Sequence, residues 1–209
     1  MRRCSQALLA LAAIFLLASA APAAAIYQYA GDNYTDIFND APPAGTYTTS
    51  MSVTGSFTLA SPLAMGETDI SGLVTSYVFN DGRSTLTEGN SQLAEGSTFF
   101  VDGVGDITTW SLKIWEINLA AGDWVPIITL YTTFDQANIG VCGAVNASGE
   151  CTYISEDELD RGYVNYLARD PTTTWNVTVA PIPASVWLFG SALGVLGWAR
   201  RRKTGRINP

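Results

Sequence analysis

The chain has 209 residues and no histidine, and its charge is unevenly distributed, since all 19 acidic but only four basic residues lie between residues 26 and 180. That region carries a net charge of −15, against −8 for the whole chain, and should repel nucleic acid and anionic lipid, because phosphate binding requires clusters of lysine and arginine. The absence of histidine excludes catalytic groups of the Ser-His-Asp and Cys-His types.

The first 25 residues have the pattern of a secretory signal peptide. Arg2 and Arg3 form a basic start, residues 7–18 are apolar, and a small-residue site that includes Ala23 and Ala25 follows. We therefore predict a signal-peptide helix that signal peptidase removes by cleavage after Ala25. An earlier small-residue site is an alternative. An uncleaved anchor is a second alternative, although the apolar run is short for a membrane span.

The middle of the chain contains short segments with β-strand patterns. In residues 51–59, apolar and polar side chains alternate, which is typical of a half-buried strand. Residues 73–88 and residues 97–119 each predict a hairpin around a turn that contains Asp and Gly. In the second hairpin the apolar phase shifts between Ile114 and Trp115, which indicates either a bulge or a strand that is buried on both faces.

Two further strands are predicted towards the end of this region. Residues 119–134 turn around Gly122 and continue as a strand, and Pro126 indicates that this strand lies at a sheet edge or begins there. Residues 174–179 complete the series. Short strands separated by Gly, Asn and Asp turns predict an all-β domain over residues 26–179, an antiparallel β-sandwich or a barrel-like fold.

A single short helix is predicted inside this domain, in residues 153–163. Ser155 and Glu158 match the spacing of a capping box, and Gly162 would end the helix after one or two turns.

Cys142 and Cys151 are the cysteines that remain after signal removal. In an oxidising compartment a closely spaced pair is a disulfide candidate, and the intervening Gly143 and Gly149 let the chain turn back on itself. Free thiols are the alternative. A metal site is not expected, because two further ligands would have to be carboxylates. We expect no cofactor, apart from weak binding of Ca²⁺ by the acidic surface.

Four tryptophans of the domain are candidates for stacking against sugar rings, and burial in the core is the alternative. They are Trp110, Trp115, Trp124 and Trp175. No catalytic residue can be assigned. Two carboxylates suffice in principle for glycoside hydrolysis, but the sequence does not select a pair from its 19 acids.

The chain ends in an ordered three-part segment. It begins with a proline-containing motif, Ala180, Pro181, Ile182, Pro183 and Ala184. An uncharged apolar run extends to residue 199 and predicts a single transmembrane helix. A basic cluster stops this run, Arg200, Arg201, Arg202 and Lys203. The positive-inside tendency places this cluster and the tail 204–209 in the cytoplasm and the acidic domain outside. A buried core helix and a GPI signal are the alternatives, and the terminal cations argue against both.

This order of parts resembles the PEP-CTERM class of bacterial sorting signals, specifically the VPLPA-CTERM subtype. The resemblance covers residues 180–203, where Ala180 replaces the usual valine and Ile182 the usual leucine. It implies export through the inner membrane of a Gram-negative bacterium and transient anchoring there. It also implies cleavage near the motif by the membrane protease exosortase, with release to the cell surface or extracellular matrix. Proteins of this class are associated with exopolysaccharide and biofilm.

The sequence thus predicts an exported surface or matrix protein with structural and adhesive roles and no catalytic activity. A lectin-like carbohydrate-binding module is the first alternative, and a secreted hydrolase that uses two carboxylates is the second. The expected partners are signal peptidase, exosortase, the inner membrane and extracellular polysaccharide, and not nucleic acid.

Overall fold

The structure, a computed structural model, describes residues 23–40, 46–165, 175–180 and 194, without the side chains of residues 155–159 and 165. The strands belong to one compact unit, Ala24–Ala180. Most of the predicted signal peptide, the sorting motif after Ala180 and the basic cluster lie outside the described residues. Within the described part of the chain, no helix has the length and apolar character that crossing a membrane requires.

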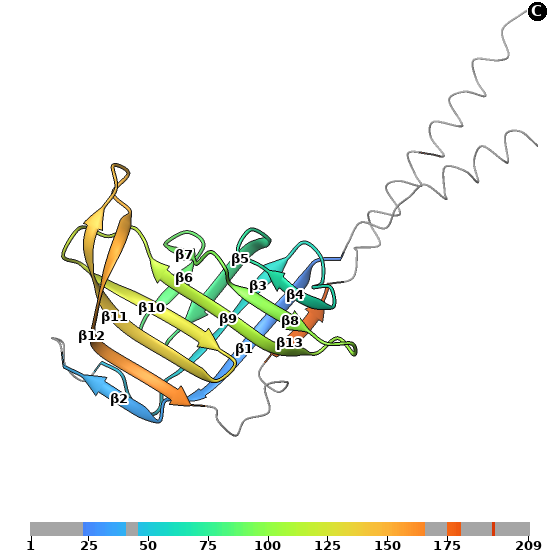
Figure 1. Cartoon of the computed structure of the whole chain (residues 1–209), viewed down its shortest axis with the longest axis horizontal. Coiled ribbons are helices and arrows are strands. Elements are labelled where there is room, and N and C mark those ends of the chain that lie inside the picture. Colours follow the sequence, from blue (N-terminus) through green and yellow to red (C-terminus); the bar gives the residue numbers. More distant parts are fainter. Residues whose placement is uncertain (1–22, 41–45, 166–174, 181–193, 195–209) are drawn as a thin grey trace, which may run out of the picture. The chain divides into compact units, whose positions relative to one another are not determined.

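The strands form two antiparallel sheets (Figure 1). Sheet A has the order β13-β1-β3-β5-β6. Its strands are β1 (Ala25–Asn33), β3 (Ser52–Leu59), β5 (Val74–Asn80), β6 (Thr85–Thr87) and β13 (Trp175–Val179). Sheet B has the order β2-β12-β11-β10-β9-β8-β4, and β7 also pairs with β9. Its strands are β2 (Asp36–Asn39), β4 (Gly66–Asp69), β7 (Ser91–Leu93), β8 (Thr98–Val101), β9 (Ile107–Glu116), β10 (Trp124–Tyr131), β11 (Phe134–Val145) and β12 (Cys151–Asn165).

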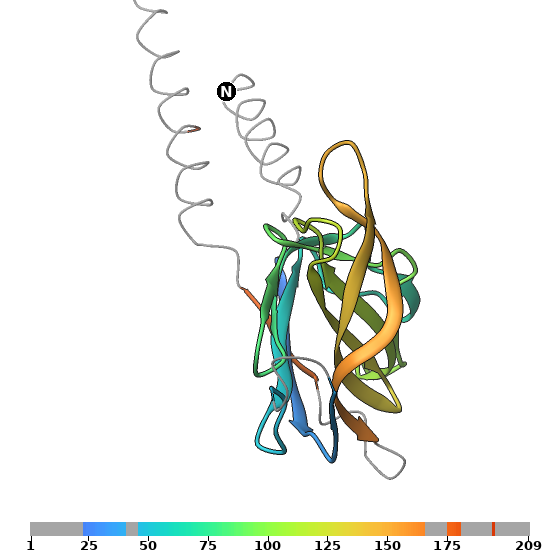
Figure 2. The same cartoon turned by 90° about the vertical axis from the view of Figure 1, so that its left-hand side faces the viewer.

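The two sheets lie face to face as two layers, as Figure 2 shows from the side. Aromatic side chains fill the space between them. The ring of Phe57, on β3, lies 4.7 Å from that of Tyr27 in the same sheet and 5.1 Å from that of Phe99 on β8 of sheet B. Burying a side chain of this size stabilises the fold by roughly 2 kcal/mol. The all-β prediction is confirmed in the form of a sandwich-like pair of antiparallel sheets, and these sheets are not closed into a barrel.

Buried hydrogen bonds also join the two sheets. The Tyr29 hydroxyl, on β1 of sheet A, donates to the carboxylate of Asp135 on β11 of sheet B over 2.6 Å. Both side chains are buried, so this bond satisfies a carboxylate that would otherwise be costly to desolvate. Gly31 makes room for it, because a Cβ atom there would stand 2.5 Å from an Asp135 carboxylate oxygen.

The strand patterns predicted in the first half of the domain are confirmed. In β3, Val53, Phe57 and Leu59 are buried while Thr54 is exposed. The two hairpins form between β5 and β6 and between β8 and β9. The phase shift in β9 arises because its outer face, exposed at Lys113, becomes partly covered at Trp115. Its register with β10 runs from Ser111 to Trp115 without a bulge, and Trp115 simply points away from the main core.

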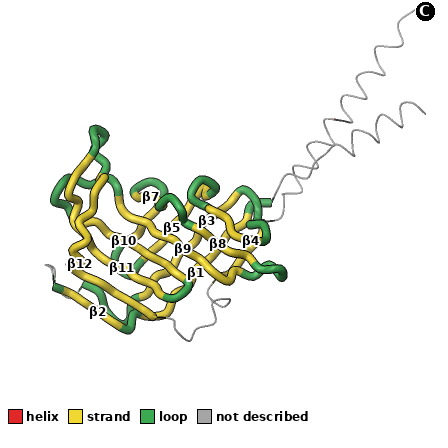
Figure 3. The backbone as a smooth tube through the Cα atoms, in the orientation of Figure 1, coloured by secondary structure: helices red, strands yellow, loops and turns green. Residues whose placement is uncertain are grey.

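The helix predicted in residues 153–163 is wrong, because these residues form part of β12 (Figure 3). β12 pairs with β11 on one side and with β2 on the other. Pairing on two sides satisfies more backbone groups than a capping box can, so tertiary context overrides the local signal. The register shifts from Ile139↔Asp160 to Val141↔Ser155, and the acidic run 156–159 therefore opposes only Gly140.

Pro126 does not mark an edge strand, because β10 lies between β9 and β11. The strand begins at Trp124, and its pairing with β9 starts only at Ile127. At Pro126, β10 therefore has a partner strand on one side, β11. A residue without an N–H group is tolerated where a second ladder is not required.

Candidate functional site

Two of the four candidate tryptophans lie in the core between the sheets. Trp110 is 4% exposed and Trp175 is 8% exposed, and their rings are 6.2 Å apart at the centroids. Trp175 also contacts Phe57 and Phe99, at 5.4 Å and 5.0 Å. Their faces are covered by other side chains, so sugar stacking, which requires an accessible face, is wrong for these two residues.

The other two tryptophans reach the surface at separate places. Trp124 is 38% exposed at the start of β10. Trp115 is half-buried on β9, and its direct partner on the neighbouring strand β10 is Ile127. Ile127 is three residues from Trp124 on β10, so alternation places Trp115 and Trp124 on opposite faces of sheet B. The four tryptophans therefore provide no shared platform.

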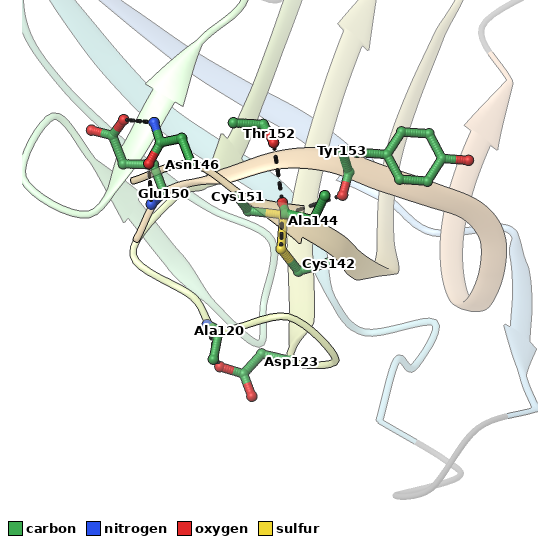
Figure 4. The surroundings of a disulfide bond; sticks show 9 residues. All are labelled: Ala120, Asp123, Cys142, Ala144, Asn146, Glu150, Cys151, Thr152 and Tyr153. Carbon is green, nitrogen blue, oxygen red and sulfur yellow. Dashed lines mark hydrogen bonds between the residues drawn. A yellow bond between two sulfur atoms is a disulfide. The ribbon is translucent and has the colours of Figure 1, made fainter. Parts of the chain in front are cut away.

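The predicted disulfide between Cys142 and Cys151 is present, with an S–S distance of 2.09 Å (Figure 4). It closes the β11–β12 hairpin next to a small apolar cluster on the outer face of sheet B. This second cluster contains Val125, Ile127 and both cysteines, with Trp115, Leu119 and Ile154 packed against it. Three backbone hydrogen bonds tie the segment 117–123 to the two cysteines. Cys151 N–H donates to Ile117 O at 2.9 Å, Gly122 N–H to Cys142 O at 2.7 Å, and Cys142 N–H to Asp123 O at 2.8 Å.

On the same face, near the opposite end of β11 from the disulfide, three aromatic side chains form a contiguous row, which we call the aromatic strip: Tyr131, Phe134 and Tyr163. The rings of Tyr131 and Phe134 are 4.8 Å apart, and those of Phe134 and Tyr163 are 5.5 Å apart. The strip crosses β10, β11 and β12. Tyr131 is 36% exposed and the other two rings are half-buried, so the row is accessible from outside the sandwich.

Register and alternation explain why these side chains meet. Tyr131 opposes Phe134 directly, and Tyr163 opposes Gln136, which lies two residues from Phe134 on the same face of β11. Buried neighbours confirm the outward direction, because Leu130 and Asp135, adjacent in sequence to Tyr131 and Phe134, both point into the sandwich.

Polar and charged groups surround the aromatic strip. The Arg161 guanidinium lies 5.9 Å above the centre of the Tyr163 ring, and Asp36 opposes Tyr163 on the other side. Lys113 is exposed on β9 and lies diagonally from Tyr131, whose direct partner there is Ser111. The strip therefore combines apolar rings with charged groups at its margins.

Tryptophan content alone did not reveal the strip. Its members are separated by up to 32 positions in the chain, and neither β11 nor the strand character of β12 is evident from the sequence pattern. One local signal was available, because Tyr131 and Phe134 flank the short turn Thr132-Thr133, where a hairpin places them opposite each other. Their contact with Tyr163 depends on the β11–β12 register.

The outer face of sheet A carries a different feature, an open hollow of about 480 Å³ lined mainly by small hydroxyl side chains. The hollow lies over β3, β5 and β6 and the turn that follows β6. It is lined by Ser56, Thr58, Ser76, Tyr77, Val78, Thr87, Glu88 and Gly89. Glu88 is the single carboxylate in this lining, and it accepts a hydrogen bond from the Tyr77 backbone N–H at 3.2 Å. Glycoside hydrolysis of the two-carboxylate type requires a second acid facing the first.

A buried polar group at one end of the sandwich provides cohesion rather than an accessible site. Asp81 is fully buried, and its carboxylate accepts three hydrogen bonds. The donors are the Tyr47 hydroxyl at 2.8 Å, the backbone N–H of Arg83 at 2.8 Å and the backbone N–H of Ser84 at 2.5 Å. Burial, and then the Asp81 charge, raises the pKa of Tyr47. The Arg83 guanidinium reaches Asp160 of β12 at 3.5 Å. This ion pair joins the β5–β6 turn of sheet A to sheet B.

Within the described residues, no group of three or more acidic or cysteine side chains is close enough to hold a metal ion. The predicted weak binding of Ca²⁺ remains a prediction. Of the predicted sorting motif, only Ala180 is described, and its N–H donates to Ala24 O at 2.8 Å directly after β13. Ala25, the predicted end of the signal peptide, is buried in β1 opposite Val179. The chain matches no family model, no curated protein and no solved structure.

Proposed function

We propose that this protein is exported, sorted through its C-terminal segment and displayed at the cell surface or in the extracellular matrix, where it has a structural and adhesive role without catalysis. The observation that carries the proposal is the Cys142–Cys151 disulfide inside a β-domain that is flanked by two targeting patterns. Structural disulfides persist in oxidising compartments, so the bridge agrees with export. The sorting step and exosortase processing rest on the resemblance of residues 180–203.

The lectin-like alternative is favoured by one specific observation, the aromatic strip. A contiguous row of aromatic rings that stays accessible on the protein surface is a feature of interaction sites. Carbohydrate binding is also compatible with the surface role. An adhesive matrix protein and a carbohydrate-binding protein are then two descriptions of the same molecule.

Intact mass spectrometry of the protein from its native host tests the export and sorting proposal. We expect a chain that begins at Ile26 and ends near Pro183, and that gains the mass of two hydrogens on reduction. A mass that retains residues 187–209 would instead indicate a single-span anchored protein. A cytoplasmic protein with free thiols would contradict export itself.

A further inference from the structure

We propose that the aromatic strip on sheet B, Tyr131, Phe134 and Tyr163, is a binding site for a neutral polysaccharide whose sugar rings have mainly equatorial hydroxyl groups. The inference rests on the proposed surface role only for the choice of a polysaccharide as ligand. The site itself follows from the arrangement of the rings.

The first step concerns the shape and chemistry of the ligand. A pyranose ring with equatorial hydroxyl groups presents flat faces of C–H bonds, and such a face packs against an aromatic ring with release of water from both. The ring centroids follow one another at 4.8 Å and 5.5 Å across three strands, with interplanar angles of 53° and 33°, so the strip is a stepped row of rings and not one flat platform. This spacing offers several successive contacts, which suits consecutive sugar units of one polymer chain better than a single sugar.

The second step concerns hydrogen bonding. Polysaccharide hydroxyl groups lose water when a ring face is buried, and they require new partners at the margin of the contact. Tyr131 and Tyr163, the two outer members of the strip, carry hydroxyl groups. The carboxamide of Asn138 lies on the same outward face of β11 as Phe134 and is half-buried. These groups donate and accept, as sugar hydroxyl groups do.

The third step concerns charge. The domain carries a net charge of −15, and Asp36 stands next to the strip across from Tyr163. An anionic polymer would approach against this field, and the two cations on this face, Lys113 and Arg161, are few against it. One of them, Arg161, already lies over the Tyr163 ring. A neutral polymer meets no such repulsion.

The outer face of sheet A is less suitable, although it has the open hollow. Its lining consists mainly of hydroxyl groups with one exposed apolar side chain, Val78, which is 43% exposed. Exchanging water for sugar hydroxyl groups brings little net free energy, whereas aromatic stacking adds the burial of apolar surface. The hollow therefore serves as the matched comparison within the same molecule.

The experiment is native affinity electrophoresis of the full chain, purified in detergent, through gels that contain hydroxyethylcellulose or polygalacturonate. We expect hydroxyethylcellulose to retard the protein more than polygalacturonate does. The double variant Tyr131→Ala with Phe134→Ala should weaken the apparent affinity by about tenfold or more, because contact residues of this kind dominate binding. The ring-preserving pair Tyr131→Phe with Phe134→Tyr keeps both ring faces but moves one hydroxyl group, so it should lose clearly less affinity than the alanine pair.

Two controls separate the strip from other exposed side chains. Tyr153→Ala removes a 61% exposed tyrosine of the β11–β12 hairpin, and Val78→Ala alters the hollow of sheet A; both should bind as the parent does. Retention of the disulfide and of the urea midpoint verifies folding. If the double variant does not fold, the single change Tyr131→Ala at an exposed position replaces it.

Each contrary outcome overturns the proposal. These outcomes are a parent protein that hydroxyethylcellulose does not retard, a strip variant that is retarded as strongly as the parent, a loss of binding in Val78→Ala, and stronger retardation by polygalacturonate. None of these outcomes alters the mass spectrum of the processed protein, so export and sorting would stand or fall separately.

Discussion

The outer faces of the two sheets differ sharply although both sheets cover the same core. In the five strands of sheet A, all of which the structure describes, Asp32 is the only Asp, Glu, Lys or Arg. The strands of sheet B contain Asp36, Glu67, Asp69, Lys113, Glu116, Asp135, Glu156, Asp157, Glu158, Asp160 and Arg161. The outward positions of sheet A are mostly Ser, Thr, Asn and Gln. Sheet B instead presents the aromatic strip and the second apolar cluster.

This difference shows which part of the sequence the fold requires. Both sheets need apolar side chains at every second position towards the core, and both have them. Outward positions need only tolerate water. Sheet B has apolar side chains at some outward positions, where polar ones would suffice. Beside the disulfide, the segment 117–123 covers these side chains. In the aromatic strip, the rings stay exposed. The exposed rings are the departure that folding does not explain.

The largest expected effect tests whether outward positions of the two sheets are equivalent. Ile127→Lys places a charge in the second cluster of sheet B, where Ile127 is 5% exposed, and should lower the free energy of unfolding by about 4 kcal/mol or more. Val78→Lys at an outward position of sheet A should change it by less than about 0.5 kcal/mol. Urea unfolding measures both. Equal losses would contradict the proposed asymmetry.

The next effect tests the shared core. Trp110→Ala removes a ring that is packed against Tyr29 and Trp175, and should cost about 3–4 kcal/mol. Trp124→Ala removes a ring that is 38% exposed and should cost about 1 kcal/mol. The comparison is made by urea denaturation at one pH. A larger cost for Trp124→Ala than for Trp110→Ala would contradict the assignment of Trp110 to the closely packed part of the core.

The disulfide provides a smaller effect that is confined to sheet B. Replacing Cys142 and Cys151 together with serine should lower the free energy of unfolding by about 2.5 kcal/mol, because a closed loop of this length restricts the unfolded chain. Hydrogen exchange should increase in the β11–β12 hairpin before it increases in β3 of sheet A. Reductant should reproduce the change in the parent protein and leave the double variant unaffected.

The smallest effect is a pH response of the β8–β9 turn. Hydrogen bonds from the backbone of Asp106, with lesser contributions from Val104 and Gly105, lower the pKa of Asp102 below its ordinary value of 3.8. A carboxylate with a lowered pKa stabilises the fold above that value and loses this contribution as pH falls through the lowered pKa.

Amide NMR signals of Val104 and Asp106 should therefore shift in acid below pH 3.8 and remain steady in Asp102→Asn. The strands of sheet A, with Asp32 at one end as their only acid, should show little response over this range. A titration of Asp102 at or above 3.8 would contradict the hydrogen-bonding explanation.

The sequence by itself determined the β class, the alternation of β3, two hairpins and the disulfide, because each depends on side chains that are close in the chain. Residues 51–59 contain both faces of one strand, and Cys142 and Cys151 are separated by nine positions. It also determined the uneven charge of the chain, since counting requires no geometry.

Only the tertiary structure decided what depends on pairing between distant strands. It turned residues 153–163 into part of β12, because β11 pairs with both ends of this segment and β2 pairs with residues 160–163. It placed Trp110 and Trp175 in the core, and it brought Tyr163 next to Phe134 through the β11–β12 register. A one-residue change of register would turn these side chains to the other face, and no local pattern in the sequence specifies that register.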